Sequence, residues 1–124
     1  MNDKKRILIA EDEPAYREIL QTQLIREGFE VAIATNGVDV LNLARSYLPQ
    51  LLLLDMRMPK KNGFEVLAEM KDDDKLKNII VIGLSNLGQD EEIRKAKQLG
   101  AQDYIIKADE PFFQLIEKIK KHLQ

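Results

Sequence analysis

The chain has 124 residues, 44% of them hydrophobic, which is enough for one domain with its own core and too few for two. Its formal net charge of −2 gives no overall electric field that would favour nucleic acid or an anionic membrane as a partner. The absence of cysteine excludes thiol chemistry and disulfides, and no apolar run approaches the about 20 residues that a membrane span needs. We therefore expect a single cytoplasmic domain over residues 1–124.

Short apolar runs alternate with amphipathic segments along the whole chain. The runs predicted as strands are 7–10, 29–34, 51–54, 79–84 and 102–106, and the segments predicted as helices are 14–27, 37–48, 64–71, 89–99 and 111–123. Strands that alternate with helices in this way form a parallel sheet with right-handed crossovers. The sequence therefore predicts an α/β, doubly wound, five-stranded sheet of flavodoxin-like order 2-1-3-4-5, with five helices on its two faces.

Helical spacing also predicts which side chains face the core. The expected inward residues are Tyr16, Ile19, Leu20 and Leu24 in the first helix, Val40, Leu41, Ala44 and Leu48 in the second, and Phe112, Leu115, Ile116, Ile119 and Leu123 in the last. The helix at 89–99 offers only Ile93, Ala96 and Leu99. We expect this helix to be the least firmly held.

The leucine run from Leu51 to Leu54 is the most informative stretch. It lies between two prolines, is too short for a helix and shows no alternation, so it predicts a strand buried on both faces. Asp55 follows at the carboxyl end of this strand, where open α/β folds place their ligand sites. An isolated strand-end Asp is most often simply solvated, so its role depends on its neighbours.

Because the carboxyl ends of parallel strands share one edge, the predicted sheet gathers Glu11, Asp12, Asp55, Ser85 and Lys107. Clustered carboxylates repel each other, and Mg²⁺ with oxygen ligands relieves that repulsion. A metal, an ammonium and a hydroxyl together suit a phosphoryl group, with a carboxylate as nucleophile forming an acyl phosphate. Taken one at a time, each residue also has a purely structural interpretation. Asp12 could cap a helix, Ser85 could be an ordinary strand-end hydroxyl, and Lys107 could be a solvated charge.

The sequence resembles the receiver domain of two-component response regulators, the family that includes the stand-alone chemotaxis regulator. The resemblance runs from Arg6 to about Leu123. The motifs that carry it are Ala10-Glu11-Asp12-Glu13, Leu54-Asp55-Met56-Arg57-Met58-Pro59, Leu84-Ser85 and Gly100-Ala101-Gln102-Asp103-Tyr104-Ile105-Ile106-Lys107.

The resemblance implies a chemistry for the strand-end cluster. Asp55 would accept a phosphoryl group from the phosphohistidine of a histidine kinase or phosphotransfer protein. Asp12, Asp55 and the backbone carbonyl of Arg57 would bind Mg²⁺, and Glu11 would hold a metal-bound water. The domain would catalyse only its own phosphorylation and dephosphorylation, so we do not expect an enzyme with a separate substrate.

The resemblance also implies how a phosphorylated domain would signal. Lys107 would pair with one phosphoryl oxygen and Ser85 would bond another, and Tyr104 would rotate inward. The surface of the helix at 89–99, the strand at 102–106 and the last helix would then dock a downstream protein target. The implied partners are proteins, not nucleic acid or membrane, and the implied assembly is a monomer or a weak phosphorylation-dependent dimer.

Two positions depart from the usual family pattern. Asn86 replaces the small residue that usually follows the Ser or Thr, which places a larger polar side chain at the mouth of the site. Ala108 replaces the cis proline that usually follows the lysine. A cis bond before a residue other than proline costs about 2.5–4 kcal/mol, so we predict a trans Lys107–Ala108 bond.

Two positions flank the expected water access to a phosphate, Arg57 and Leu87. We expect Arg57 to form an ion pair with Glu13 at the rim of the site and so to slow hydrolysis. Further along the chain, His122 is predicted to be solvated and without a role. Asp103, with lysines on the neighbouring helices, resembles the charged face through which some receivers dimerise, although a solvated surface charge is the favoured interpretation.

Three other functions compete with a phosphorylated receiver. The first alternative is a pseudo-receiver, an unphosphorylated interaction module of the same fold, which Asn86 and Ala108 keep open. The second is a Mg²⁺-dependent phosphohydrolase, although no cap insertion for substrate choice is evident. A flavin site is disfavoured because the loop after the first strand is acidic and would repel the cofactor phosphate.

Overall fold

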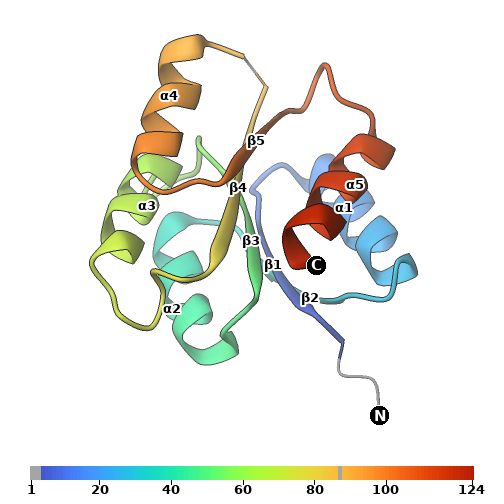
Figure 1. The fold of residues 1–124 in the computed structure, drawn as a ribbon, viewed down its shortest axis with the longest axis horizontal. Coiled ribbons are helices and arrows are strands. Elements are labelled where there is room, and N and C mark those ends of the chain that lie inside the picture. The colour runs from blue at the N-terminus through green and yellow to red at the C-terminus, as the bar shows by residue number, and fades with distance from the viewer. Residues whose placement is uncertain (1–3, 87) are drawn as a thin grey trace.

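The computed structural model describes residues 4–86 and 88–124 (Figure 1). A parallel sheet in the order β2-β1-β3-β4-β5 forms its centre, which confirms the predicted fold and strand order. The strands are β1 (Arg6–Ala10), β2 (Glu30–Ala34), β3 (Leu51–Asp55), β4 (Ile80–Ser85) and β5 (Asp103–Ile106). The helices are α1 (Pro14–Arg26), α2 (Gly37–Tyr47), α3 (Gly63–Lys71), α4 (Asp90–Gln98) and α5 (Phe112–Leu123).

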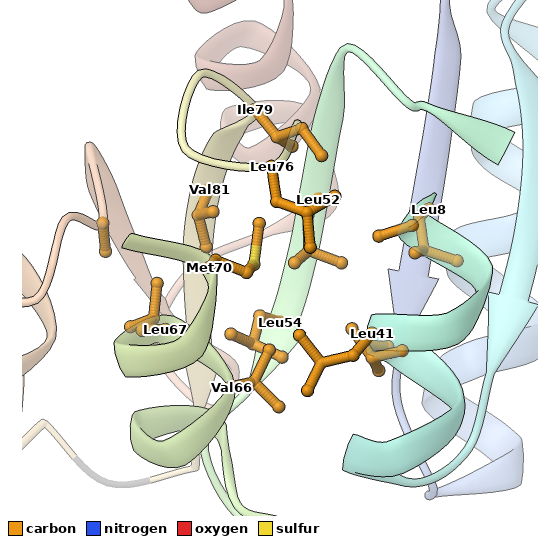
Figure 2. Packing of buried hydrophobic residues seen from close by; sticks show 14 of the residues in the cluster. Leu8, Leu41, Leu52, Leu54, Val66, Leu67, Met70, Leu76, Ile79 and Val81 are labelled. Atoms are coloured by element: carbon orange, nitrogen blue, oxygen red, sulfur yellow. The ribbon is translucent and has the colours of Figure 1, made fainter. Parts of the chain in front are cut away.

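The sheet has helices on both faces, with α1 and α5 on one side and α2, α3 and α4 on the other (Figure 1). The central strand β3 is buried along its whole length, as its leucine run predicts. Leu52 and Leu54 pack toward α2 and α3, as Figure 2 shows, whereas Leu51 and Leu53 join the cluster beneath α1 and α5. Two separate cores thus hold β3 from opposite sides, which fixes the position of Asp55 at its end.

Local signals in the sequence set the start of α3 beside that strand end. The Asn62 side chain accepts a hydrogen bond from the Glu65 N–H at 2.9 Å, and the Glu65 side chain accepts one from the Asn62 N–H at 3.0 Å. This capping box begins α3 at Gly63. A Cβ at Gly63 would lie 2.7 Å from the Met56 Cα, so only glycine lets the helix approach the segment after Asp55 so closely.

Two side chains predicted to face the core are exposed instead. Ile19 is 44% exposed, because the row formed by Leu20 and Leu24 faces the sheet and Ile19 lies ~100° away around the helix. Leu48 is 46% exposed, because it is the C-cap of α2 in a left-handed conformation with φ 50°. Its carbonyl accepts a hydrogen bond of 2.7 Å from the Arg6 guanidinium.

The weak anchoring expected for α4 is confirmed. Ala96 is its one fully buried residue, while Ile93 and Leu99 are only partly buried against the core. Within the described residues, no helix is long and apolar enough to cross a membrane.

The contrast between Leu20 and Ile19 gives a test of the packing of α1. Leu20→Ala should lower the free energy of unfolding by about 2–5 kcal/mol, because it opens a cavity in a fully buried row. Ile19→Ala, one residue earlier and half exposed, should cost less than about 1 kcal/mol. Urea unfolding of both variants measures the difference, and equal losses would contradict the orientation of α1.

Candidate phosphorylation site

The carboxyl edge of the sheet brings together the acidic residues that the sequence singles out. Carboxylate oxygens of Glu11, Asp12 and Asp55 all lie within 4.8 Å of one another. Glu11 and Asp55 are buried, at 0% and 5% exposure, whereas Asp12 is open to solvent. The cluster therefore has a buried floor and one exposed acid at its mouth.

Lys107 lies in the floor of this cluster and not in solvent. Its ammonium is 3.2 Å from the Asp55 Oδ2 and forms an ion pair with the Glu11 Oε1, and its side chain is 4% exposed. Burial alone would lower the pKa of Lys107, but the two carboxylates outweigh burial and raise it. Burial also raises the pKa of Glu11, to about 7, with Asp55 adding to the rise and Lys107 opposing it.

The backbone around Asp55 is fixed by hydrogen bonds. The Asp55 Oδ1 accepts a hydrogen bond from the Arg57 N–H at 3.0 Å, and the Met56 N–H donates to the Leu84 carbonyl at 3.0 Å. The Met56 carbonyl in turn accepts from the Gly63 N–H at 3.0 Å. Asp55 therefore presents Oδ2 toward Lys107 while Oδ1 is held by its own turn.

Ser85 and Tyr104 lie beside the cluster on neighbouring strands. Ser85 is 1% exposed at the end of β4, and its carbonyl accepts a hydrogen bond of 2.8 Å from the Lys107 N–H. Tyr104 is 5% exposed, so its ring already points inward. Burial raises the pKa of the Tyr104 phenol, and the nearby Ser85 hydroxyl opposes that rise. The Asn86 side chain at the mouth of the site is exposed.

Gly83, which the sequence analysis did not single out, makes the inward Tyr104 ring possible. The two residues are paired in the β4–β5 register. A Cβ at Gly83 would lie 2.7 Å from the Tyr104 Cδ2, closer than a side chain tolerates. The signal was a glycine within an otherwise continuous apolar strand, where a close approach of another group is a common reason for glycine.

The expected ion pair between Arg57 and Glu13 is wrong. The Arg57 Nη2 lies 2.5 Å from the Oε1 of Glu92 in α4, while the Glu13 N–H donates to the Glu11 Oε2 at 3.1 Å. Glu92 is one of three acids in the first turn of α4, which lies within reach of the long Arg57 side chain. Leu87, the other residue predicted to flank the phosphate, lies outside the described residues.

A hollow of about 530 Å³ opens beside the cluster. Asp12, Arg57 and Glu92 are among the residues that line it. The Arg57–Glu92 ion pair therefore borders a hollow that lies beside Asp12 and the segment that follows Asp55.

The predicted trans Lys107–Ala108 bond is confirmed, since no peptide bond among the described residues is cis. The chain turns directly after β5, where the N–H groups of Asp109 and Glu110 donate to the Ile106 carbonyl at 3.1 and 3.0 Å. This turn keeps the Lys107 side chain at the strand end without a proline.

Asp103 and His122 are not the solvated groups that the sequence suggested. The His122 Nε2 lies 3.0 Å from the Asp103 Oδ2, and Lys118 lies 3.9 Å from the Oδ1. Partial burial would raise the pKa of Asp103, but the His122 and Tyr104 N–H hydrogen bonds and the Lys118 charge outweigh it and lower the pKa. These contacts join β5 to the end of α5.

Comparison with known proteins agrees with this geometry. The sequence profile of the response regulator receiver domain matches residues 7–120. The chain belongs to the response regulator receiver domain family. The polar-differentiation response regulator DivK of Brucella anthropi is 33% identical over 120 residues, which cover 96% of each chain.

One group of relatives is longer than this chain, and two similar response regulators have known structures, one phosphorylated and one with bound Mn²⁺. The chain spans less than half of the probable transcriptional regulator ycf27 of Porphyra purpurea: the match is 36% identical and covers 89% of this chain but 44% of ycf27. The phosphorylated cyanobacterial phytochrome response regulator RcpA is 32% identical with a TM-score of 0.85, covering 96% of this chain and 93% of RcpA. The Mn²⁺-bound form of response regulator Rcp1 is 28% identical with a TM-score of 0.80, covering 94% of this chain and 91% of Rcp1.

The lowered pKa of Asp103 predicts a pH-dependent contribution to stability. A carboxylate with a depressed folded-state pKa stabilises the protein above its unfolded pKa, and this contribution is lost as the pH falls through the folded pKa. Asp103→Asn should therefore cost up to about 1 kcal/mol at pH 7, and the difference should shrink toward zero below about pH 4. Urea unfolding across this range measures it, and a loss that does not vary with pH would contradict the pairing.

Proposed function

We propose that the chain is a phosphorylation switch in two-component signalling, in which Asp55 accepts a phosphoryl group from the phosphohistidine of a histidine kinase or phosphotransfer protein in a Mg²⁺-dependent reaction. The observation that carries this proposal is the buried Lys107 ammonium, which joins Asp55 and Glu11 beside the exposed Asp12. The proposed location is the cytoplasm.

The acidic cluster fits a hard divalent cation. Its three carboxylates offer oxygen atoms within 4.8 Å of one another, and Mg²⁺ binds through one or two carboxylates together with waters. Asp12, Asp55 and the Arg57 carbonyl would bind the ion, and Glu11 would hold one of its waters. The ion would supply positive charge opposite the oxygens of an incoming phosphoryl group. The similar response regulator Rcp1 has been solved with bound Mn²⁺, which supports a divalent cation in this family.

The chain's own residues account for the transfer. An Asp55 carboxylate oxygen forms the new P–O bond while the P–N bond of the donor breaks, and its electron pair stays on the leaving imidazole. Lys107 pairs with one phosphoryl oxygen and the Ser85 hydroxyl donates to another. Asp55 is held by the Arg57 N–H and by a rigid strand, so little has to be reorganised before attack.

Addition of a dianionic group would change the surface formed by α4, β5 and α5. Ser85 is one strand away from Tyr104, and α4 is held mainly by Ala96 and two half-buried side chains. A helix with so few buried contacts responds to a small local change in charge. We propose that a downstream protein docks on this surface, and that the chain is a monomer or dimerises weakly when phosphorylated.

Mass spectrometry with a small acyl-phosphate donor tests the proposal. Wild-type protein should gain one phosphoryl group with Mg²⁺ and none after chelation, and Asp55→Asn should gain none. Glu13→Gln, which removes a neighbouring exposed acid, is the matched control and should be phosphorylated like wild type.

The alternatives make different predictions in the same assay. No gain in a folded wild-type protein, at several donor concentrations, would favour the pseudo-receiver. Sustained turnover of a phosphate ester would favour the phosphohydrolase. The intact set of Asp12, Asp55, Ser85 and Lys107 favours neither.

The Arg57–Glu92 ion pair should slow loss of the phosphoryl group, since it borders the hollow through which water would approach. Arg57→Ala and Glu92→Ala should each shorten the half-life of the acyl phosphate by about two- to fivefold, in line with an exposed pair worth up to about 1 kcal/mol. The double variant should match the single ones. An unchanged half-life in both single variants would contradict this role.

A further inference from the structure

The Lys107 ammonium has a third partner besides its two carboxylates. Its Nζ lies 4.8 Å from the centroid of the Tyr16 ring in α1. The Lys107 side chain is 4% exposed, so solvent does not compete for the charge. A cation over an aromatic face is attracted by the negative face of the ring, and this attraction grows when water is excluded.

The Tyr16 ring is itself held in place from α5. Its centroid lies 5.3 Å from that of Phe112, with the two ring planes tilted by 32°. Burial raises the pKa of the Tyr16 phenol to about 12, with the charge of Glu11 adding to the rise, so the ring stays neutral. The neutral Tyr16 ring, which α1 and α5 hold in place, thus lies against one side of the Lys107 ammonium.

We propose that Tyr16 is a positioning residue for phosphoryl transfer. Its ring face would hold the Lys107 ammonium beside the Asp55 carboxylate. This inference rests on the function proposed above. The two carboxylates bind the ammonium through directional hydrogen bonds, and Asp55 must give up part of its contact when it is phosphorylated. A cation over the ring face is attracted out to about 6 Å from the centroid, so at 4.8 Å the contact survives a small movement of the ammonium toward a phosphoryl oxygen.

A series of ring substitutions separates this role from ordinary packing. Tyr16→Phe keeps the aromatic face and should be phosphorylated by an acyl phosphate within about twofold of wild type, whereas Tyr16→Leu should be slower by about tenfold. Phenylalanines with one, two and three ring fluorines at position 16 keep the shape but weaken the negative face. Their phosphorylation rates should fall in that order, and equal rates across the series would overturn the proposal.

Tyr47→Leu is the matched control. Tyr47 also lies beneath a cation, with the Arg6 guanidinium 5.9 Å from its ring centroid, but at the opposite end of the sheet. This variant should lose some stability and keep the wild-type phosphorylation rate. A rate loss equal to that of Tyr16→Leu would show that general destabilisation is responsible, and would overturn the role of Tyr16.

A double-mutant cycle keeps this inference distinct from the proposed function. The unfolding free energies of Tyr16→Leu, Lys107→Met and the double variant give the coupling between the two side chains without any phosphorylation. A favourable coupling is expected, and no coupling would overturn the contact. If the wild type takes up no phosphoryl group, both the proposed function and the role of Tyr16 in transfer are wrong. If the phosphorylation rate does not change with ring fluorination, only the role of Tyr16 is wrong.

Discussion

The buried ammonium of Lys107 is the interaction on which the site depends. A charge at 4% exposure is tolerable only with partners, and Glu11 and Asp55 supply them from β1 and β3. The same arrangement keeps two carboxylates close together that would otherwise repel each other. Three strand ends, far apart in the sequence, are therefore tied into one electrostatic unit, to which we propose that a phosphoryl group is added.

The elements around this unit differ in how firmly they are packed. Two cores hold β3 from both faces and so fix the backbone that carries Asp55. By contrast, α4 has one fully buried residue, and it is tied to the segment after Asp55 by the Arg57–Glu92 ion pair. This contrast fits a switch, because a change in charge at a fixed point is transmitted most easily to the element with the fewest buried contacts.

Hydrophobic periodicity predicted the strands and helices, because it shows which segments must be buried. The handedness of the crossovers and the common flavodoxin-like order then predicted the strand order and the residues at the carboxyl edge. Periodicity failed where one residue's environment depends on how elements meet. Ile19 lies just outside the buried row of its helix, and Leu48 turns outward at a left-handed cap. The partners of Arg57 and His122 were missed because long or terminal side chains pair with whatever element lies within reach in space. Neither Glu92 nor the contact between Tyr16 and Lys107 leaves a pattern in the sequence.

Of the three carboxylates in the acidic cluster, we propose that only that of Asp55 carries the phosphoryl group. Borohydride reduces an acyl phosphate to an alcohol and so converts a phosphorylated aspartate into homoserine, which tandem mass spectrometry locates in the chain. After incubation with an acyl-phosphate donor and Mg²⁺, homoserine should appear at position 55 alone. Reduction at Asp12, reduction of the Glu11 side chain, or no reduced residue in a protein that has gained mass would contradict it.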